Sequence, residues 1–331
     1  MKSKNILVTG GLGFIGSHLV KELITLDYTV WVVDDFSNSK IEPESFFKVP
    51  VRNLVSALSR FYDVKDDPRK PKIVFLEADF THSAILERIE DGFFSKVFHL
   101  AAKPRVEWSV TNPLDATDEN FNKSLDLALA CAKGESRLIF SSTSAVYGNN
   151  KNLPTKESDN KKPTNPYGLS KLCVEQYLEL FENLYNLDWV ALRYFNVYGP
   201  GQDGSSPYST AISAWCTKAS NEEPLRKDGD GTQSRDLIYV SDIVSANICV
   251  SKADLKEEKI FNVGVGKSYS NNYILSKFFE KGYTNIEQAP ARKGDVKHTQ
   301  ANISALKKLG WNPKVQFEEG LEKVFNYWEL L

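Results

Sequence analysis

A tyrosine and a lysine stand four residues apart in the stretch NPYGLSK, at Tyr167 and Lys171. Residues four apart on a helix share one face, and a nearby ammonium favours the ionised form of a phenol and so lowers its pKa. Such a pair can exchange a proton with a substrate hydroxyl near neutral pH. The same spacing to a lysine follows Tyr147 and Tyr273, so the sequence context has to choose among three pairs.

The context favours the pair that begins at Tyr167. The Asn-Pro step at 165–166 is typical of a helix start, and apolar residues at helical spacing continue to about residue 185. Tyr147 is instead followed by Gly-Asn-Asn, which predicts a turn, and Tyr273 lies far along the chain from the glycine-rich segment described next. We therefore predict one acid–base pair, carried by one capped helix.

A glycine-rich segment, TGGLGFIG at residues 9–16, follows an apolar run and precedes a helical pattern. Its glycines let the backbone turn tightly and approach a pyrophosphate, whose charge is favoured by the N-terminus of the following helix. Asp34 ends the next predicted strand, where a carboxylate can bind a ribose and repel a 2′-phosphate. The segment therefore predicts a dinucleotide site that prefers NAD to NADP.

Continuous apolar runs alternate with helical patterns over the first 200 residues, at 4–9, 28–34, 72–77, 96–100, 137–142 and 188–194. They lack the alternation of a half-exposed strand, so they predict a parallel sheet with helices on both faces. The predicted fold class is α/β, a Rossmann-type doubly wound parallel sheet with a smaller C-terminal α/β lobe. Helical spacing of apolar residues over 51–62 predicts an amphipathic helix inserted between the second and third strands, within 35–71.

The composition changes near residue 200, where glycine and proline become frequent and the predicted strands become short. We predict that residues 1–199 and 236–254 form an NAD-binding Rossmann domain. Residues 200–235 and 255–331 are predicted to form the smaller lobe, which binds the substrate.

The charge balance and the rare residues exclude several classes of partner. The formal net charge of the 331 residues is −2, so no basic excess indicates binding to nucleic acid or to an anionic membrane. The sequence shows neither a signal-peptide pattern nor an apolar run long enough to span a bilayer. The four cysteines and four histidines lack the spacing of metal ligands. We expect a cytoplasmic protein with reduced thiols and no metal.

The chain resembles the extended short-chain dehydrogenase/reductases, and within them the nucleotide-sugar epimerase/dehydratase group. The resemblance covers nearly the whole chain. Besides Asp34, it rests on TGGLGFIG (9–16), HLAA (99–102), SSTSAVYG (141–148), YGLSK (167–171), LRYFNVYGP (192–200), SRDLIYVSDI (234–243) and RKGDVKHTQA (292–301). It implies an enzyme that binds NAD and a nucleotide-diphosphate sugar. It also implies a homodimer built on helices at about 117–132 and 167–185, with apolar surface from Leu125, Leu129, Leu172, Tyr177 and Phe181.

The resemblance also implies roles for individual residues. Tyr167 would be the catalytic base and acid, Lys171 would lower its pKa and bind the nicotinamide ribose, and Thr143 would hydrogen-bond the reacting hydroxyl. The cofactor contacts would be Gly10, Gly13, Phe14, Ile15, Gly16, Asp34, Asp79, Ala101, Ala102, Asn120, Tyr167, Lys171 and Tyr194. The substrate contacts would be Asn196, Arg235, Arg292 and Asp295 at the diphosphate and Thr299 beside C2 of the sugar.

The residues after Thr143 bear on the type of reaction. Relatives that eliminate water or decarboxylate their substrate carry an acid there, whereas this chain has Ser144 and Ala145. The resemblance therefore implies C4 epimerisation of a UDP-sugar through a 4-keto intermediate. A small residue at Thr299 leaves room for an acetamido group, which favours UDP-N-acetylglucosamine and UDP-N-acetylgalactosamine, alongside UDP-glucose and UDP-galactose.

Two alternatives to this function stay open at the level of the sequence. A UDP-glucuronate 4-epimerase, or another nucleotide-sugar epimerase or reductase, could use Lys103 and Arg105 to bind a carboxylate. A non-catalytic NAD-binding scaffold is the more distant alternative, because such a protein should lack the tyrosine, the lysine or the Ser/Thr that this chain retains.

Overall fold

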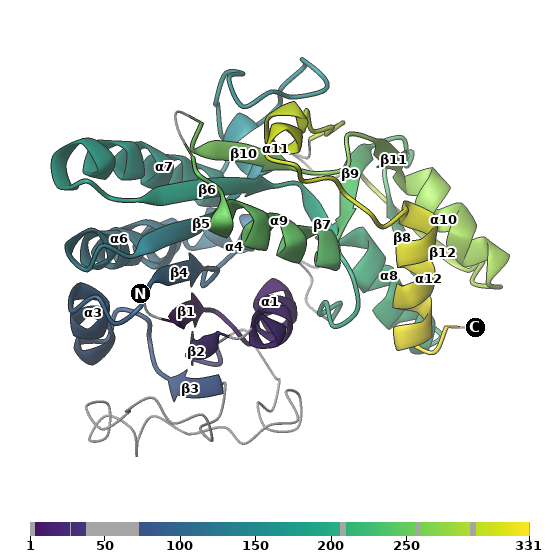
Figure 1. Ribbon diagram of the computed structural model, residues 1–331. Helices are drawn as coiled ribbons and strands as arrows, with labels where there is room; N and C mark the ends of the chain where they lie inside the picture. Colours follow the sequence, from purple (N-terminus) through teal and green to yellow (C-terminus); the bar gives the residue numbers. More distant parts are fainter. Residues whose placement is uncertain are drawn as a thin grey trace.

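The computed structural model describes residues 4–26, 28–37, 73–205, 210–255, 258–291 and 296–330. Within these residues, seven parallel strands form one sheet in the order β10-β6-β5-β4-β1-β2-β3 (Figure 1). The strands are β1 (Asn5–Thr9), β2 (Thr29–Asp34), β3 (Ile73–Glu77), β4 (Lys96–His99), β5 (Arg137–Thr143), β6 (Trp189–Tyr194) and β10 (Ile260–Val263). The order reverses between β1 and β4, the place where such sheets bind ligands.

Helices cover both faces of this sheet, because successive residues of each strand point to opposite sides and both sides are apolar. Leu7 and Trp31 lie in the apolar cluster on one face, and Val8 and Val32 lie in the cluster on the other. The first face is covered by α3 (Ser83–Glu90), α6 (Lys123–Lys133) and α7 (Pro166–Tyr185). The second is covered by α1 (Phe14–Thr25) and α9 (Val240–Lys252). The predicted doubly wound fold class is confirmed.

The smaller lobe has its own apolar cluster, in which Trp215 and Phe278 are buried. Its sheets have the strand orders β11-β9-β7 and β12-β8. Its elements are β7 (Asn196–Tyr198), α8 (Ala211–Ser220), β8 (Leu225–Asp228), β9 (Ser234–Tyr239), β11 (Ser268–Ser270), α10 (Asn271–Glu280), β12 (Ile286–Ala289) and α12 (Phe317–Tyr327). Strand β10 belongs by sequence to the predicted 255–331 segment but pairs with β6 in the main sheet, with α11 (Ser304–Lys308) packed beside it. The division into two domains stays a prediction.

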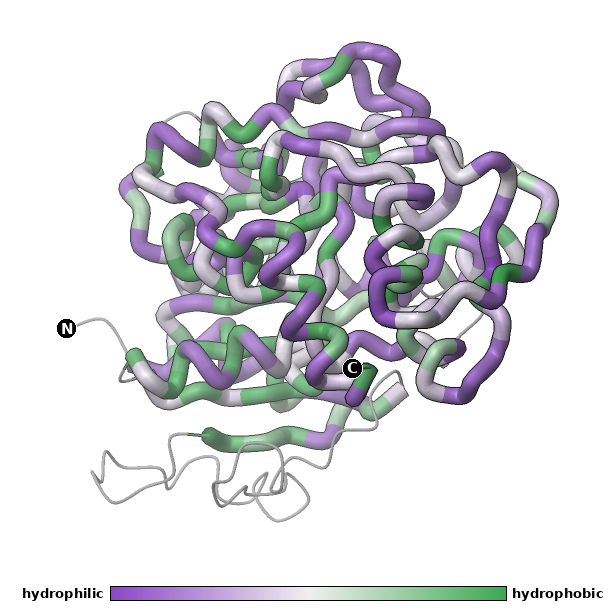
Figure 2. The backbone as a smooth tube through the Cα atoms, turned by 90° about the vertical axis from the view of Figure 1, so that its right-hand side faces the viewer, coloured by the Kyte–Doolittle hydropathy of each residue, from purple (hydrophilic) through white to green (hydrophobic). Residues whose placement is uncertain are grey.

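Short helical segments follow two strands of the main sheet, β4 and β5. Between β4 and α6 run α4 (Val106–Thr111), α5 (Pro113–Thr117) and a π-helical turn (Asp118–Asn122), and a 3-10 turn follows β5 (Ser144–Tyr147). Figure 2 shows the edge strand β3 as an almost continuous hydrophobic segment at the bottom of the view. No helix of the described residues is both long and apolar enough to cross a bilayer. The amphipathic helix predicted over 51–62 lies outside the described residues.

Candidate active site

The glycine-rich segment forms a backbone cradle between β1 and α1. Gly10 has a φ of +67°, and a Cβ at Gly16 would lie 2.1 Å from the carbonyl oxygen of Gly10. Only glycine fits such positions, because any side chain would push the two backbone segments apart. Helix α1 begins after Gly13 with no side-chain cap and with no acidic residue in its first turn. Its N-terminal N–H groups therefore suit an anion such as a pyrophosphate.

Asp34 lies beside this cradle at the end of β2, as predicted for the ribose-binding carboxylate. Its two oxygens accept hydrogen bonds from the backbone N–H groups of Leu12 and Phe36, each at 3.0 Å. Burial raises the pKa of Asp34, although these two donors oppose the shift. The carboxylate thus joins the strand end to the glycine-rich turn.

Helix α7 begins as the sequence predicts. The side chain of Asn165 accepts a hydrogen bond from Gly168 N at 2.8 Å, and Pro166 occupies the first turn. This cap aims the next residues of the helix at the end of β5, where the Thr143 side chain lies near enough to the Tyr167 hydroxyl to act on its pKa. Lys171 lies one turn further along α7 and is fully buried, with its ammonium 4.6 Å from the ring centre of Phe140.

The other two tyrosine–lysine pairs are placed differently. The Tyr147 hydroxyl is buried and donates to Asn262 Oδ1 at 2.7 Å. Tyr273 lies on α10 in the smaller lobe, where its hydroxyl donates to the Glu318 carboxylate at 2.6 Å. Of the three tyrosines, Tyr167 is therefore the one that lies beside Thr143 at the carboxyl end of the main sheet.

The electrostatics of Tyr167 differ from the sequence prediction. Burial raises the pKa of Tyr167 to about 12, and the nearby Thr143 side chain only partly offsets this shift. Burial also lowers the pKa of Lys171 to about 7. A lysine that loses its own charge in an apolar site cannot lower the pKa of its neighbour in the way the spacing suggests.

The remaining cofactor positions predicted from the resemblance lie in α1, in a π-helical turn, and at or after the carboxyl ends of β3, β4 and β6. A Cβ at Gly10 would lie 2.7 Å from Ala101 N, so Ala101 and the adjacent Ala102 follow β4 beside the glycine turn. Asp79 accepts a hydrogen bond from Lys123 Nζ at 2.7 Å on the same side of the sheet as α6. Asn120 is buried in the π-helical turn, and Phe14 and Ile15 open α1. The Tyr194 hydroxyl, at the end of β6, is bonded to Ser141 and Asn247.

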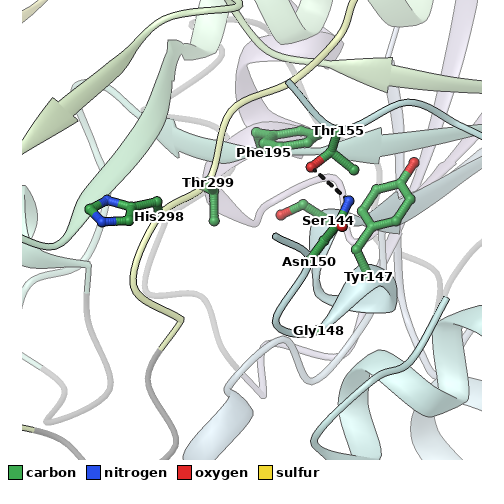
Figure 3. A pocket seen from close by; sticks show the side chains of 8 residues that line it. All are labelled: Ser144, Tyr147, Gly148, Asn150, Thr155, Phe195, His298 and Thr299. Atoms are coloured by element: carbon green, nitrogen blue, oxygen red, sulfur yellow. Dashed lines mark hydrogen bonds between the residues drawn. The ribbon is translucent and has the colours of Figure 1, made fainter. Parts of the chain in front are cut away.

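A small pocket opens beside the end of β5. It is lined by Ser144, Tyr147, Gly148, Asn150, Thr155, Phe195, His298 and Thr299 (Figure 3). The Thr299 hydroxyl accepts a hydrogen bond from Asp236 N at 3.1 Å, so β9 holds this residue in place. In Figure 3 the His298 ring points away from Ser144, and Thr299 lies between the two.

The predicted substrate residues are partly described. Asn196 lies on β7, opposite Leu237 of β9. Arg235 also lies on β9, two residues before Leu237. Arg235 Nη1 donates to Ser234 O at 3.0 Å. Arg292 and Asp295 lie outside the described residues. Asn150 and Thr155 line the pocket without having been predicted, because a loop that returns to residue 301 by a β-bridge places them there.

Two observations of the site fit a dinucleotide. The cradle excludes side chains where a pyrophosphate would approach, and Lys171 Nζ is buried without a hydrogen-bond partner among the described residues. A buried ammonium without a partner is costly, so its position indicates a ligand that supplies acceptors such as ribose hydroxyls. The residues that would hold NAD are therefore those of the cradle, Asp34 and Lys171.

Comparisons with known proteins agree with this geometry. Residues 6–264 match the NAD dependent epimerase/dehydratase family. The chain is 33% identical to a putative UDP-glucose 4-epimerase of Methanocaldococcus jannaschii, over 97% of each chain. Its fold is similar to a UDP-N-acetylglucosamine 4-epimerase from Methanobrevibacter ruminantium in complex with UDP-N-acetylmuramic acid (TM-score 0.86, 38% identity, 99% of each chain). It is also similar to a UDP-glucose 4-epimerase from Thermotoga maritima with UDP-glucose (TM-score 0.84, 35% identity, 98% of each chain).

The chain belongs to the NAD dependent epimerase/dehydratase family. The resemblance seen in the sequence, the NAD cofactor and the enzyme class, an NAD-dependent nucleotide-sugar 4-epimerase, are confirmed. The individual sugar and the roles of single residues are the subject of the proposal that follows.

Proposed function

We propose that this enzyme inverts C4 of UDP-N-acetylglucosamine and UDP-N-acetylgalactosamine through a 4-keto intermediate, and that it also accepts UDP-glucose and UDP-galactose. One observation carries the proposal: the neighbouring side chains of Tyr167 and Thr143 lie at the end of β5, where a pocket bordered by Ser144 and Thr299 begins. No carboxylic acid lines this pocket among the described residues, so dehydration and decarboxylation lack the acid group that they need.

Tyr167 acts as the proton acceptor and donor in this proposal. Its phenolate takes the proton of the C4 hydroxyl and becomes the phenol, and Thr143 hydrogen-bonds the same oxygen. Bound NAD supplies a hydride acceptor and the positive charge of its nicotinamide ring. Because burial holds the pKa of Tyr167 near 12, the phenol needs a positive charge beside it in order to ionise near neutral pH. Lys171 holds the nicotinamide ribose through an ammonium that has no hydrogen-bond partner among the described residues.

The sugar must rotate so that hydride returns to its opposite face, while the nucleotide stays bound. In this proposal, Asn196, Arg235, Arg292 and Asp295 bind the nucleotide diphosphate. A planar guanidinium can bind two phosphate oxygens at once, which anchors the substrate at one end only. The sugar itself meets small side chains, Ser144 and Thr299, that leave room for it to turn.

Thr299 supports the acetamido sugars as substrates. Its short side chain borders the pocket, and its position is held by the bond from Asp236 N. Solved relatives carry the names of both sugar classes, since one is a UDP-N-acetylglucosamine 4-epimerase and another is a UDP-glucose 4-epimerase. A pocket that holds the larger sugar also admits the smaller one.

The two basic residues that could favour a uronic acid have other partners. Lys103 Nζ donates to the Ser37 hydroxyl at 2.5 Å, near the ribose-binding Asp34. Arg105 pairs with Asp203 at 3.7 Å. Neither side chain lines the pocket, so these cations support UDP-glucuronate less well than the neutral sugars.

The test is to incubate the protein separately with UDP-N-acetylglucosamine, UDP-glucose and UDP-glucuronate, and to follow the C4 configuration by proton NMR. Conversion of the first two is expected. Thr299→Tyr should abolish conversion of the acetamido sugar while sparing UDP-glucose, and Tyr167→Phe should abolish both. Conversion of UDP-glucuronate alone would show that the pocket argument is wrong, and conversion of none would contradict the proposed function.

We also propose a homodimer built on the outer face of α4, α5 and α7. Leu114 is 83% exposed, and Val110, Leu169 and Leu184 are each more than half exposed. A monomer seldom exposes so many large apolar side chains on neighbouring helices. The sequence predicted a different surface, on the helices at about 117–132 and 167–185. Of its five apolar residues, Tyr177 is exposed, Phe181 is buried, and Leu125, Leu129 and Leu172 are partly buried. Light scattering should give twice the chain mass, and Leu184→Glu should reduce it to a monomer.

A further inference from the structure

His99 is a buried histidine at the end of β4, and none of the roles proposed above uses it. Its side chain is fully inaccessible to solvent, and both ring nitrogens are hydrogen-bonded. Nδ1 lies 2.7 Å from the Thr9 hydroxyl, and Nε2 lies 2.9 Å from the Ser124 hydroxyl. The ring packs between Phe80 and Phe140, with ring centres 4.8 and 5.9 Å away. Burial and the nearby charge of Lys171 lower the pKa of His99 well below its usual value.

The neighbouring hydrogen bonds determine which nitrogen carries the proton. The Ser124 hydroxyl donates to Asn120 O at 3.0 Å, so its oxygen must accept from His99 Nε2–H. Nδ1 is then an acceptor, and Thr9 donates its hydroxyl proton to it. The Thr9 oxygen in turn accepts from Ala101 N at 3.3 Å. In the opposite tautomer, the Thr9 proton would have no acceptor among the described residues, which buried hydroxyls avoid.

The result is a directed chain of hydrogen bonds, from Ala101 N–H through Thr9, His99 and Ser124 to the carbonyl of Asn120. Each end of this relay touches the cofactor site. Ala101 N is adjacent to Gly10, where a Cβ would lie 2.7 Å away. Asn120 Oδ1 accepts from Lys103 N at 2.9 Å, so it holds the segment that follows Ala101. Asn120 sits in a π-helical turn, a distortion that often marks a functional position.

We propose that His99 is a positioning residue for NAD: as the neutral Nε2–H tautomer, it links Thr9 to Ser124 and so holds the cofactor-facing ends of β1 and β4 together. The inference rests on the proposed assignment of Gly10, Ala101 and Asn120 to the cofactor site. His99 touches neither the cofactor nor the substrate in this arrangement. Its loss should therefore weaken NAD binding and leave the chemical step largely intact.

The tautomer is tested first, by nitrogen NMR of the histidine side chains. The chain has four histidines, so the signal missing from His99→Phe identifies His99. We expect a protonated Nε2, a bare Nδ1 and no change between pH 8 and pH 6. A protonated Nδ1, or a titration near the usual histidine pKa of about 6.5, would overturn the relay.

NAD binding to cofactor-stripped protein is then measured by calorimetry. His99→Phe keeps a ring between Phe80 and Phe140 but breaks both hydrogen bonds, and it should weaken NAD binding at least about tenfold. At saturating NAD, kcat should stay within about threefold of the wild-type value. His99→Asn keeps an acceptor for Thr9 and His99→Gln keeps a donor for Ser124, so each should recover part of the affinity. His82→Gln, an exposed change at the start of α3, is the matched control and should bind NAD as the wild type does.

Wild-type NAD affinity in His99→Phe would overturn the proposal, and so would a kcat that is lost even at saturating NAD. Circular dichroism shows at which temperatures each variant is folded, and NAD binding is compared only at those temperatures. If His99→Phe does not fold, the NAD affinities of His99→Asn and His99→Gln are compared with that of the wild type instead. The outcome is independent of the proposed substrate, because a wild-type protein that binds NAD and converts no sugar contradicts the proposed function alone.

Discussion

Arg193 of β6 and Glu175 of α7 form a buried ion pair, and breaking it should lower the unfolding free energy by several kcal/mol. Their side chains are 1% and 2% exposed, and two bonds join them, Nε to Oε1 at 3.0 Å and Nη2 to Oε2 at 2.6 Å. Glu175 lies one helical turn after Lys171 and also accepts from Ser142. Arg193 also donates to the hydroxyl of Tyr147, a residue that lines the pocket beside β5.

The magnitude follows from what each substitution leaves behind. Arg193→Met leaves the Glu175 carboxylate buried with the Ser142 hydroxyl as its remaining partner, and an uncompensated buried charge costs about 3–5 kcal/mol of unfolding free energy. Glu175→Leu leaves the Arg193 guanidinium buried without its carboxylate partner, and it should lower the unfolding free energy by a similar amount. The double variant buries no charge. It leaves the Ser142 hydroxyl without its acceptor, which costs about 1–3 kcal/mol, so the double variant should be more stable than either single variant.

Urea unfolding followed by tryptophan fluorescence measures these free energies, with the slope against urea checked for constancy. The matched control is the exposed pair of Lys133 and Glu90, whose side chains are 63% and 37% exposed and which lie 2.8 Å apart. Lys133→Met should change the unfolding free energy by less than about 1 kcal/mol. The reasoning is refuted if Arg193→Met costs no more than this control, or if the double variant loses the sum of the two single losses.

Further outcomes are expected at the cradle and on α7. Gly16→Ala places a Cβ 2.1 Å from Gly10 O, so NAD affinity, measured by calorimetry, should fall at least about tenfold. Gly13→Ala should cause a smaller loss of affinity, because its Cβ would lie 3.2 Å from the same oxygen. Asn165→Ala removes the cap of α7 and should lower the unfolding free energy by about 1 kcal/mol, measured in urea. Between pH 10.5 and about 7 the unfolded chain binds a proton at Lys171 that the folded, cofactor-free protein does not, so stability should rise with pH across this window. Lys171→Met should abolish this rise of stability with pH, raise the stability at pH 8, and abolish turnover. If the slope of the unfolding free energy against pH is unchanged by the substitution, the burial argument is contradicted.

The sequence predicted the architecture of the main sheet well because its strands are buried on both faces and therefore read as continuous apolar runs. It did not reveal β10, which lies between a charged segment and Gly-Val-Gly in the half of the chain predicted to form the smaller lobe, because its pairing with β6 is decided by the path of the chain. The pocket wall formed by Asn150 and Thr155 was also missed, since an irregular loop has no periodicity to read.

The local motifs by themselves determined the glycine cradle, the cap of α7 and the choice of Tyr167 over the other two tyrosines as the proposed acid–base residue. These features depend on residues close together in the chain, where backbone sterics and helix capping act. Only the tertiary structure decided the electrostatics: the pKa of Tyr167 is near 12 and that of Lys171 near 7 because distant strands bury them. The same is true of the His99 relay, in which bonded donors and acceptors are up to 92 residues apart in the chain. Desolvation depends on what packs around a group in space, and residue spacing along the chain does not specify it.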